Sequence, residues 1–372
     1  MTLKKYKIFN RRRKIMKLKG RLFWLFIIII ILIVCFISLD VGLEVLGIKQ
    51  EEVINFTDGN LEQIIRKELQ KDSGVITISE VKDIRKLDAS DSSITSIEGI
   101  KHLTNLTKLN LSRNKIEDID ELKYLTKLSS LDLSVLPLYK EGDLSPLSKL
   151  TNLKSLKLSR NYIADLSSLQ NLTNLTYLRL CFNQISDISP LRNLTNLTEL
   201  YLQTNYIENI DPLANLTNLR ILNLDIENTI NNVEVLLNLN KLEELHLSNV
   251  YIAKEDIGLL GKLKNLNLTA LSLGGNNIED ISLLKDFTNL IYLALDGNEI
   301  TDISPLIHIK KLETLCITQN KIKDIEPLLE LKNLSYVDLS DNEFDKSKGS
   351  EAMKIVNKLR DRGSKVILDY DY

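Results

Sequence analysis

Leucine and isoleucine recur along most of this chain in one fixed pattern, LxxLxLxxNxI. It occurs twelve times between residues 84 and 344, and eight of the eleven intervals between successive copies are 22 residues long. The copies open at Ile84, Leu106, Leu128, Leu153, Leu175, Leu197, Leu219, Leu242, Leu268, Leu290, Leu312 and Leu334. Because successive side chains of a strand point to opposite faces, the leucines of LxL point inward and their neighbours point outward. Each copy therefore predicts one short strand with a buried face and an exposed face.

One such unit cannot bury its apolar side alone, but stacking on its neighbours makes a continuous core. The pattern is typical of a leucine-rich repeat solenoid, an α/β repeat fold whose parallel strands line the concave side. The segment that returns to the next strand reads IxDIxPLxxLTN, with proline at Pro146, Pro190, Pro212, Pro305 and Pro327. Proline lacks an N–H group and fixes its own φ, so the pattern predicts short 3₁₀ or extended return segments.

An asparagine follows most of the predicted strands, at the point where the chain turns away from the sheet. Its amide can both donate to and accept from backbone groups that would otherwise be buried and unpaired, so stacked copies predict a structural ladder. The ladder residues are Asn114, Asn161, Asn183, Asn205, Asn276, Asn298, Asn320 and Asn342. In the other four repeats the matching positions are Ser92, Leu136, Glu227 and Val250, and the last three lie within intervals of 25, 23 and 26 residues. We expect these four repeats to be locally irregular.

Amphipathic helices are predicted on both sides of the repeats, where they would cover the open ends of the core. Upstream, Asp58 is a suitable N-cap and Gly74 a suitable end for a helix with an apolar face of Leu61, Ile64, Ile65 and Leu69. Downstream, Ser350 and Gly363 delimit a helix with Met353, Ile355, Val356 and Leu359 facing inward, and a last strand is predicted at Val366–Leu368.

The segment from Leu22 to Leu39 has no charged residue, and residues 1–21 before it contain ten Lys or Arg and no acid. As a helix with a rise of about 1.5 Å per residue, it would be roughly 27 Å long, close to the hydrocarbon thickness of a bilayer. The basic flank favours a cytoplasmic amino terminus and an extracytoplasmic remainder. No A-x-A pattern follows, so we favour an uncleaved transmembrane signal-anchor; secretion after signal cleavage is the alternative.

These features divide the chain into six predicted parts. They are a basic cytoplasmic segment (1–21), a transmembrane signal-anchor (22–39), a linker (40–54), an N-terminal cap (55–83), twelve repeats (84–345) and a C-terminal cap (346–372). After residue 21, 38 basic residues face 50 acidic ones, a formal balance of −12. Because nucleic-acid binding depends on concentrated positive charge, this balance argues against a nucleic-acid partner.

Sequence signals of enzyme chemistry are missing: there is no metal-ligand cluster, phosphate-binding loop or nucleophile elbow. We therefore expect no catalytic residues, no metal and no cofactor. Cys181 and Cys316 lie six repeats apart, too far for a disulfide at about 4.8 Å per strand. The sequence leaves the oligomeric state open.

The concave side is the predicted place for a ligand, because the outward positions of the middle repeats combine aromatic residues with arginine. The candidate residues are Tyr177, Arg179, Phe182, Glu199, Tyr201, Gln203, Ile221, Asn223, Glu244 and His246. At a strand spacing of about 4.8 Å, Tyr177 and Tyr201 should be near neighbours with Arg179 beside them. Tyrosine and arginine are frequent interface anchors, although strand tyrosines also occur for packing reasons alone. A second, weaker group is Tyr292, Asp296, Tyr336 and Asp338, which could equally form a solvated strand face.

The repeats, together with the segment Asn55–Gly74 before them, resemble the internalin-type 22-residue leucine-rich repeat of bacterial surface proteins. The resemblance implies a binding module, and some members of that family bind host receptors. The sequence ends at Tyr372 without the sorting motif or apolar tail of the wall-linked members. We therefore expect a membrane-anchored, extracytoplasmic protein that binds a protein or peptide on its concave face. The alternatives are a secreted adhesin for a host surface receptor and a regulatory or structural partner of another membrane protein.

Overall fold

The computed structural model describes residues 24–31, 52–138, 143–252, 254–265 and 267–369, and the chain divides into two compact units, Met1–Val53 and Ile54–Tyr372. In the first unit, residues 24–31 are helical, with exposed apolar side chains such as Trp24 and Phe26. The rest of the predicted membrane segment Leu22–Leu39, the basic segment 1–21 and the linker up to residue 51 lie outside the described residues. Within the described ranges, no helix is both long and apolar enough to cross a membrane.

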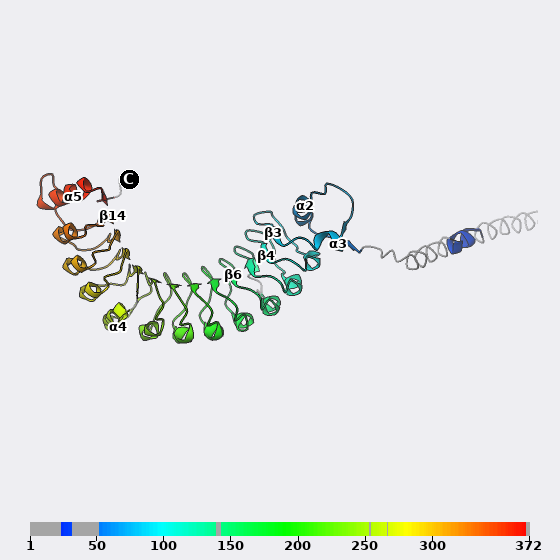
Figure 1. Cartoon of the computed structure of the whole chain (residues 1–372), viewed down its shortest axis with the longest axis horizontal. Coiled ribbons are helices and arrows are strands. Elements are labelled where there is room, and N and C mark those ends of the chain that lie inside the picture. Colours follow the sequence, from blue (N-terminus) through cyan, green and yellow to red (C-terminus); the bar gives the residue numbers. More distant parts are fainter. Residues whose placement is uncertain (1–23, 32–51, 139–142, 253, 266, 370–372) are drawn as a thin grey trace, which may run out of the picture. The chain divides into compact units, whose positions relative to one another are not determined.

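The second unit is built on one parallel sheet of thirteen strands, in which each strand pairs with the next one in the sequence. The predicted leucine-rich repeat solenoid with its parallel sheet is confirmed. Figure 1 shows the strands on the inner side of the arc of repeats and the return segments on its outer side. The strands are β3 (Lys86–Asp88), β4 (Lys108–Asn110), β5 (Ser130–Asp132), β6 (Ser155–Lys157), β7 (Tyr177–Arg179), β8 (Glu199–Tyr201), β9 (Ile221–Asn223), β10 (Glu244–His246), β11 (Ala270–Ser272), β12 (Tyr292–Ala294), β13 (Thr314–Cys316), β14 (Tyr336–Asp338) and β15 (Lys365–Ile367).

Most return segments are short 3₁₀ helices, and the five prolines of the sequence pattern lie in their first turn, where no N–H donor is needed. These helices are η1 (Ile100–His102), η2 (Asp120–Tyr124), η4 (Ser145–Lys149), η5 (Ser167–Leu169), η6 (Ser189–Asn193), η7 (Asp211–Asn215), η8 (Val233–Asn238), η9 (Gly261–Asn265), η10 (Ser282–Asp286), η11 (Ser304–His308) and η12 (Glu326–Glu330). The interval of 26 residues between Leu242 and Leu268 also contains an α-helix, α4 (Lys254–Leu260). Four extra residues are enough for one further helical turn.

The core is one continuous cluster that runs through all the repeats and into both caps. The central leucines of successive strands, such as Leu178, Leu200 and Leu222, have no exposed surface, while the residues on either side of each are half-buried. This alternation is the one predicted from LxL. It leaves two outward side chains per strand, which together form the concave surface.

The N-terminal cap consists of β1 (Val53–Ile54), α2 (Gly59–Glu68), β2 (Ile76–Thr77) and α3 (Ile78–Val81). Asp58 caps α2 by accepting hydrogen bonds from the N–H groups of Asn60 and Leu61, and the predicted apolar face packs on the core. The predicted end at Gly74 was wrong, because α2 ends at Glu68 and the chain turns at Gln70, whose φ is 53°. The Lys71 N–H closes that turn by donating to the Arg66 carbonyl at 2.9 Å, so no glycine is needed there.

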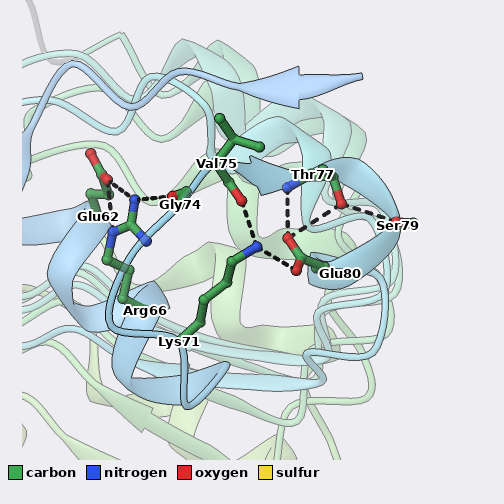
Figure 2. Close-up of polar contacts among 8 residues, drawn as sticks. All are labelled: Glu62, Arg66, Lys71, Gly74, Val75, Thr77, Ser79 and Glu80. Atoms are coloured by element: carbon green, nitrogen blue, oxygen red, sulfur yellow. Dashed lines mark hydrogen bonds and ion pairs between the residues drawn. The ribbon is translucent and has the colours of Figure 1, made fainter. Parts of the chain in front are cut away.

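Polar side chains fasten the loop that follows α2 (Figure 2). Arg66 pairs with Glu62 at 2.7 Å and also donates to the carbonyl of Gly74 at 2.8 Å. Lys71 reaches Glu80 at 2.6 Å, and Glu80 in turn accepts from the backbone N–H of Thr77 at the start of α3. These contacts hold the loop against the helix that covers the first repeat.

The C-terminal cap is formed by α5 (Glu351–Asp361) and β15. Ser350 accepts a hydrogen bond from the Met353 N–H at 3.1 Å, and Val356 and Leu359 are buried. Met353 and Ile355 are partly buried against the core, and Gly363 follows the helix with a φ of 96°. The last strand begins at Lys365 and pairs with β14, so it covers the open edge of the sheet.

Candidate functional site

Strands β7 and β8 bring together the aromatic and basic residues that the sequence singled out on the concave side. Their register places Tyr177 opposite Glu199 and Arg179 opposite Tyr201. The rings of Tyr177 and Tyr201 lie 5.6 Å apart at an interplanar angle of 44°, and the Arg179 guanidinium lies 5.2 Å from the centre of the Tyr201 ring. We call these four residues the Tyr–Arg patch. Both tyrosines and the arginine are half-buried, so each keeps an accessible face.

Hydrogen bonding fixes the orientation of the Tyr201 ring. Its hydroxyl donates to the Glu199 carboxylate at 3.1 Å. Burial, followed by this hydrogen bond and the negative charge of Glu199, raises the pKa of Tyr201 well above its ordinary value. The hydroxyl therefore stays protonated at physiological pH, and the patch presents two aromatic faces, a cation and a carboxylate in a fixed arrangement.

The outward residues of β9 and β10 continue the patch with more polar groups. The Asn223 amide nitrogen donates to the Asp225 carboxylate at 3.3 Å, and His246 Nδ1 lies 2.9 Å from the Ser272 hydroxyl. The backbone N–H of Ser248 donates to Asp225 at 2.6 Å, while burial raises the pKa of this carboxyl group. The neighbouring outward residues are Ile221 and Glu244. These groups are oriented mainly by one another, so they extend the surface without forming a reactive centre.

Two of the predicted concave residues lie beyond the ends of their strands. Phe182 follows β7 in a left-handed turn with a φ of 57°, and the Arg160 guanidinium stacks 3.9 Å from its ring centre. Gln203 follows β8, and its side-chain oxygen is buried without a hydrogen-bond partner among the residues that the structure describes. Side chains alternate between the two faces of the sheet only within a strand. The sequence pattern therefore could not place the side chains of Phe182 and Gln203.

The weaker second group lies around Cys316 of β13, and its Tyr292, Asp296 and Asp338 all interact with that thiol. Strand β13 lies between Tyr292 and Tyr336, with Thr314 in register with both. Asp296 accepts from the N–H and hydroxyl of Thr318 at 2.9 and 3.1 Å, and Asp338 is similarly engaged with Ser340. Both carboxylates are therefore used within the sheet, and the group has a structural explanation.

Between them lies Cys316, whose thiol contributes no reactive centre. Burial and the nearby Asp296 raise the pKa of this thiol to about 11, and burial raises the pKa of Tyr292 to about 12. Because the thiolate is the nucleophilic form, this shift in pKa disfavours nucleophilic chemistry at Cys316 near neutral pH. The described residues also contain no group of three or more His, Cys, Asp or Glu side chains that could hold a metal ion.

The asparagines after the strands are buried and bond to the backbone of the preceding repeat. The Asn183 amide oxygen accepts from the N–H groups of Asn161 and Ile163 at 3.1 and 3.0 Å. Its amide nitrogen donates to the carbonyls of Leu158 and Leu180 at 3.0 and 2.9 Å. The same arrangement recurs with variations at the other seven asparagines of the sequence pattern: Asn114, Asn161, Asn205, Asn276, Asn298, Asn320 and Asn342.

One further asparagine belongs to this ladder, and the sequence pattern missed it. Asn228 is fully buried, accepts from the Ile207 N–H at 2.9 Å and donates to the Leu224 carbonyl at 2.8 Å. The expectation that Glu227 occupies this position was wrong by one residue. Ile226 and Glu227 both have a left-handed backbone, with φ of 61° and 65°, and this turn absorbs the additional residue of the 23-residue interval. The sequence did contain a signal for this ladder residue. The repeat is one residue longer than the usual 22, and its asparagine comes one position later than in the other repeats.

The lateral edge beside this ladder carries exposed apolar side chains, of which the sequence had singled out only Phe182, as a residue of the concave face. Six consecutive repeats contribute one such residue each, and each residue is between 40 and 66% exposed. We call this set the edge row: Val135, Tyr162, Phe182, Tyr206, Ile226 and Tyr251. In the sequence, the signal for this row would have been an apolar residue directly before or after a ladder position.

A family model described as leucine-rich repeats, two copies, matches residues 82–124, 173–215, 266–308 and 310–349. A solved internalin, inlF from Listeria monocytogenes, is 32% identical, covers 87% of this chain and 99% of its own, and has a TM-score of 0.71. A leucine-rich repeat protein from Leptospira interrogans is 23% identical over 78% of this chain and 85% of its own, with a TM-score of 0.57. The functional domain of InlJ from Listeria monocytogenes is 22% identical over 78% and 82%, with a TM-score of 0.53. The last two share the fold. A search of curated protein sequences finds no match.

Proposed function

The chain belongs to the internalin-type leucine-rich repeat proteins, and we propose that its repeats bind a protein or peptide partner through the Tyr–Arg patch. The observation that carries the proposal is the packing of Tyr177, Tyr201 and Arg179 into one half-buried group on the concave sheet. Solenoids commonly use this concave surface for binding, and tyrosine and arginine dominate the energetics of many interfaces.

The patch is suited to recognition because its side chains are already ordered. The Tyr201 ring is held by Glu199 and flanked by Tyr177 and Arg179, so little rotamer freedom is left to lose when a partner binds. The faces of the two rings accept apolar or cationic groups, while Arg179 and Glu199 offer charges of both signs. A partner that presents apolar side chains with polar groups around them fits this surface. It can be a folded domain or an extended segment.

We propose further that the repeats lie outside the cytoplasm and are tethered to the membrane by the segment Leu22–Leu39. The support is in the sequence: eighteen uncharged residues follow ten basic ones. From Asp40 to Leu61, about twenty residues span at most about 70 Å when fully extended. The repeats then stay near their own membrane, and the partner is at or near the same surface.

The test begins with a pull-down of the full chain from detergent-solubilised cells, followed by affinity measurements with the partner recovered. Tyr201→Ala and Arg179→Ala are each expected to weaken binding by about 1 kcal/mol or more, roughly fivefold, because they remove half-buried anchor groups with an accessible face. Circular-dichroism melts should remain nearly unchanged, since neither side chain belongs to the core.

Matched controls come from the same sheet at a distance from the patch. Tyr336→Ala on β14 and Lys108→Ala on β4 remove similar side chains and are expected to leave the affinity unchanged. Full affinity in the Tyr201→Ala, Arg179→Ala double variant would rule out the patch. A partner recovered only from foreign cells would instead favour a host adhesin.

A further inference from the structure

Charge on the concave surface divides at the Tyr–Arg patch. This surface consists of the two outward residues of each strand and the next one, two places beyond the end of the strand. Along β3–β7 these positions include four basic and two acidic side chains: Lys86, Lys108, Lys157, Arg179, Asp88 and Asp132. Along β8–β14 they include five carboxylates and neither lysine nor arginine: Glu199, Asp225, Glu244, Asp296 and Asp338. The concave surface therefore has a basic half and an acidic half, and the two tyrosines of the patch lie where these meet.

The basic half keeps a net positive charge after its own ion pair is taken into account. Lys157 and Asp132 form that pair at 3.3 Å. The Asp88 carboxylate accepts only from the N–H and hydroxyl groups of one serine, at 3.1 and 2.7 Å. Neither Lys108 nor Arg179 has an ion pair among the residues that the structure describes. Their charges are therefore available to a carboxylate of a partner.

The carboxylates of the acidic half are held by neutral donors, so their negative charges are not cancelled. Asp225 accepts from one backbone N–H and one side-chain amide. Asp296 and Asp338 each accept from one backbone N–H and one hydroxyl. Arg220 precedes β9, but both oxygens of Glu243 bind its guanidinium and balance its charge. Within the described part of the chain, no lysine or arginine bonds to a carboxylate of the acidic half.

The effect of these charges can be seen on the neighbouring groups. Burial and then the charge of Asp296 raise the pKa of the Cys316 thiol to about 11. Burial raises the pKa of Tyr292 to about 12, and Asp296 contributes to this shift as well. At the end of this half, the Lys365 ammonium group lies 5.6 Å from the centre of the Tyr336 ring. A surface that disfavours the loss of protons and accepts an ammonium group on an aromatic face favours a cationic partner group.

The strand register fixes the spacing between the charges on the two sides of the patch. The row of outward residues that contains Arg179 reaches His246 on β10, and the neighbouring row passes through Tyr177 and Ile221 to Glu244. Arg179 and Glu244 are therefore three strand spacings apart across the sheet, about 14 Å, and two residues apart along it, about 7 Å. An extended chain covers the resulting distance of roughly 16 Å in about five residues.

We propose that the partner contributes an extended segment that crosses the strands with an acidic side chain at Arg179 and a basic side chain, about five residues away, at Glu244. The side chains between them are apolar and pack on Tyr201 and Ile221. This inference rests on the proposed binding role of the Tyr–Arg patch and adds the chemistry and the direction of the bound segment. Charge complementarity of this kind fixes the register of a segment and disfavours segments whose two ends carry the same charge.

Calorimetric titration of the full chain in mild detergent with synthetic peptides tests the proposal. The probe is the octapeptide Gly-Glu-Leu-Tyr-Leu-Ser-Lys-Gly with blocked ends, which places the glutamate and the lysine at the required spacing. We expect this mixed peptide to bind roughly fivefold or more tightly than the same peptide with two glutamates or with two lysines at those positions. Equal affinities of the three peptides, or no binding of the mixed peptide, would overturn the proposal. Either result is distinct from a failure of the patch, which is tested with the whole recovered partner and Tyr201→Ala.

Charge reversal in the protein tests which side receives which charge. Glu244→Lys should weaken binding of the mixed peptide roughly fivefold or more and strengthen binding of the two-glutamate peptide, whereas Arg179→Glu should favour the two-lysine peptide. Glu244→Gln removes the charge while keeping the shape of the side chain, and it should also weaken the mixed peptide.

Glu208→Lys is the matched control, because Glu208 is an exposed carboxylate between β8 and η7, and its reversal changes the net charge by the same amount. It should leave the affinities of all three peptides unchanged. Equal effects of Glu208→Lys and Glu244→Lys would show that net charge, and not the position of Glu244, determines binding, and would refute the proposed direction.

Discussion

At the scale of single residues, a buried asparagine amide does what no apolar side chain can do at the turn after a strand. At Asn183 it satisfies two backbone N–H groups and two carbonyls of its own and the preceding repeat. Leaving a buried backbone N–H or C=O group without a partner destabilises the fold by more than forming its hydrogen bond stabilises it. Leu136 and Val250 fill two of these positions, and their own N–H groups still bond to the asparagine of the next repeat.

Replacing Asn183 by alanine is therefore expected to lower the free energy of unfolding by roughly 1–3 kcal/mol, because several backbone groups lose their partners. Asn228→Ala should lower the free energy of unfolding by a similar amount, although the repeat pattern in the sequence assigns that ladder position to Glu227. Urea melts of both variants provide the measurement. Glu227→Ala is the control and should change stability by less than about 0.5 kcal/mol, as is usual for an exposed residue. Equal small effects at all three positions would show that the asparagines are not needed.

At the scale of elements, α2 and α5 determine whether the stack of repeats is closed at its ends. Leu61 and Ile65 of α2 cover the first repeat, and Val356 and Leu359 of α5 cover the last. Asp58 links α2 to the first repeat directly. One of its oxygens caps the helix, while the other accepts from the N–H and hydroxyl of Thr95 at 2.8 and 2.9 Å.

Asp58→Ala is expected to lower the free energy of unfolding by roughly 1–3 kcal/mol, because it removes a helix cap and the link to Thr95. Burial raises the pKa of Asp58, but the hydrogen bonds from Thr95, Leu61 and Asn60 outweigh it and hold the pKa below its ordinary value of 3.8. The folded state thus favours the charged form. The contribution of this charge is complete above the unfolded pKa and disappears as the pH falls through the folded pKa.

Urea melts of wild type and Asp58→Ala between pH 7 and pH 2 would measure this contribution. The difference in stability between the two proteins should narrow below about pH 4. Asp72 is an exposed aspartate in the same cap. Asp72→Ala should neither lower the free energy of unfolding at pH 7 nor show a difference from wild type that shrinks at low pH. A difference that persists unchanged at pH 2 would contradict the assigned role of the carboxylate.

At the scale of the whole molecule, two surfaces of the solenoid are separate and can be occupied together. The Tyr–Arg patch lies on the concave sheet, whereas the edge row follows the turns beside the ladder. The Tyr–Arg patch is the surface proposed for a partner.

The proposed topology predicts which positions are reached from outside an intact cell. A membrane-impermeant maleimide should label Thr301→Cys, which lies at an exposed position of the repeats, in cells stripped of their wall. Thr2→Cys, on the proposed cytoplasmic side, should be labelled only after lysis. The wild-type chain measures the background labelling, because Cys181 is buried, Cys316 is partly buried, and burial raises the pKa of both thiols. Protection of Thr301→Cys until lysis would reverse the assignment.

The sequence by itself determined the solenoid, the strand positions and most of the ladder, because each follows from a local rule repeated twelve times. Alternation fixes which leucines are buried, and stacking identical units fixes which strands are neighbours. The meeting of Tyr177, Tyr201 and Arg179 could be predicted for that reason. The expected end of α2 at Gly74 failed because a non-glycine residue, Gln70, makes the left-handed turn that closes the helix, so the position of the glycine did not mark its end.

Only the tertiary structure shows how the chain accommodates departures from its 22-residue repeat. Asn228, rather than Glu227, enters the ladder, because two left-handed residues absorb an extra position and the buried backbone groups select whichever amide reaches them. Phe182 leaves the concave sheet for the edge by the same kind of turn, and it joins five apolar residues that lie far apart in the sequence. Exposure and backbone conformation arise only when the repeats are stacked, so the sequence could offer apolar residues beside the ladder but could not show that they form one exposed row.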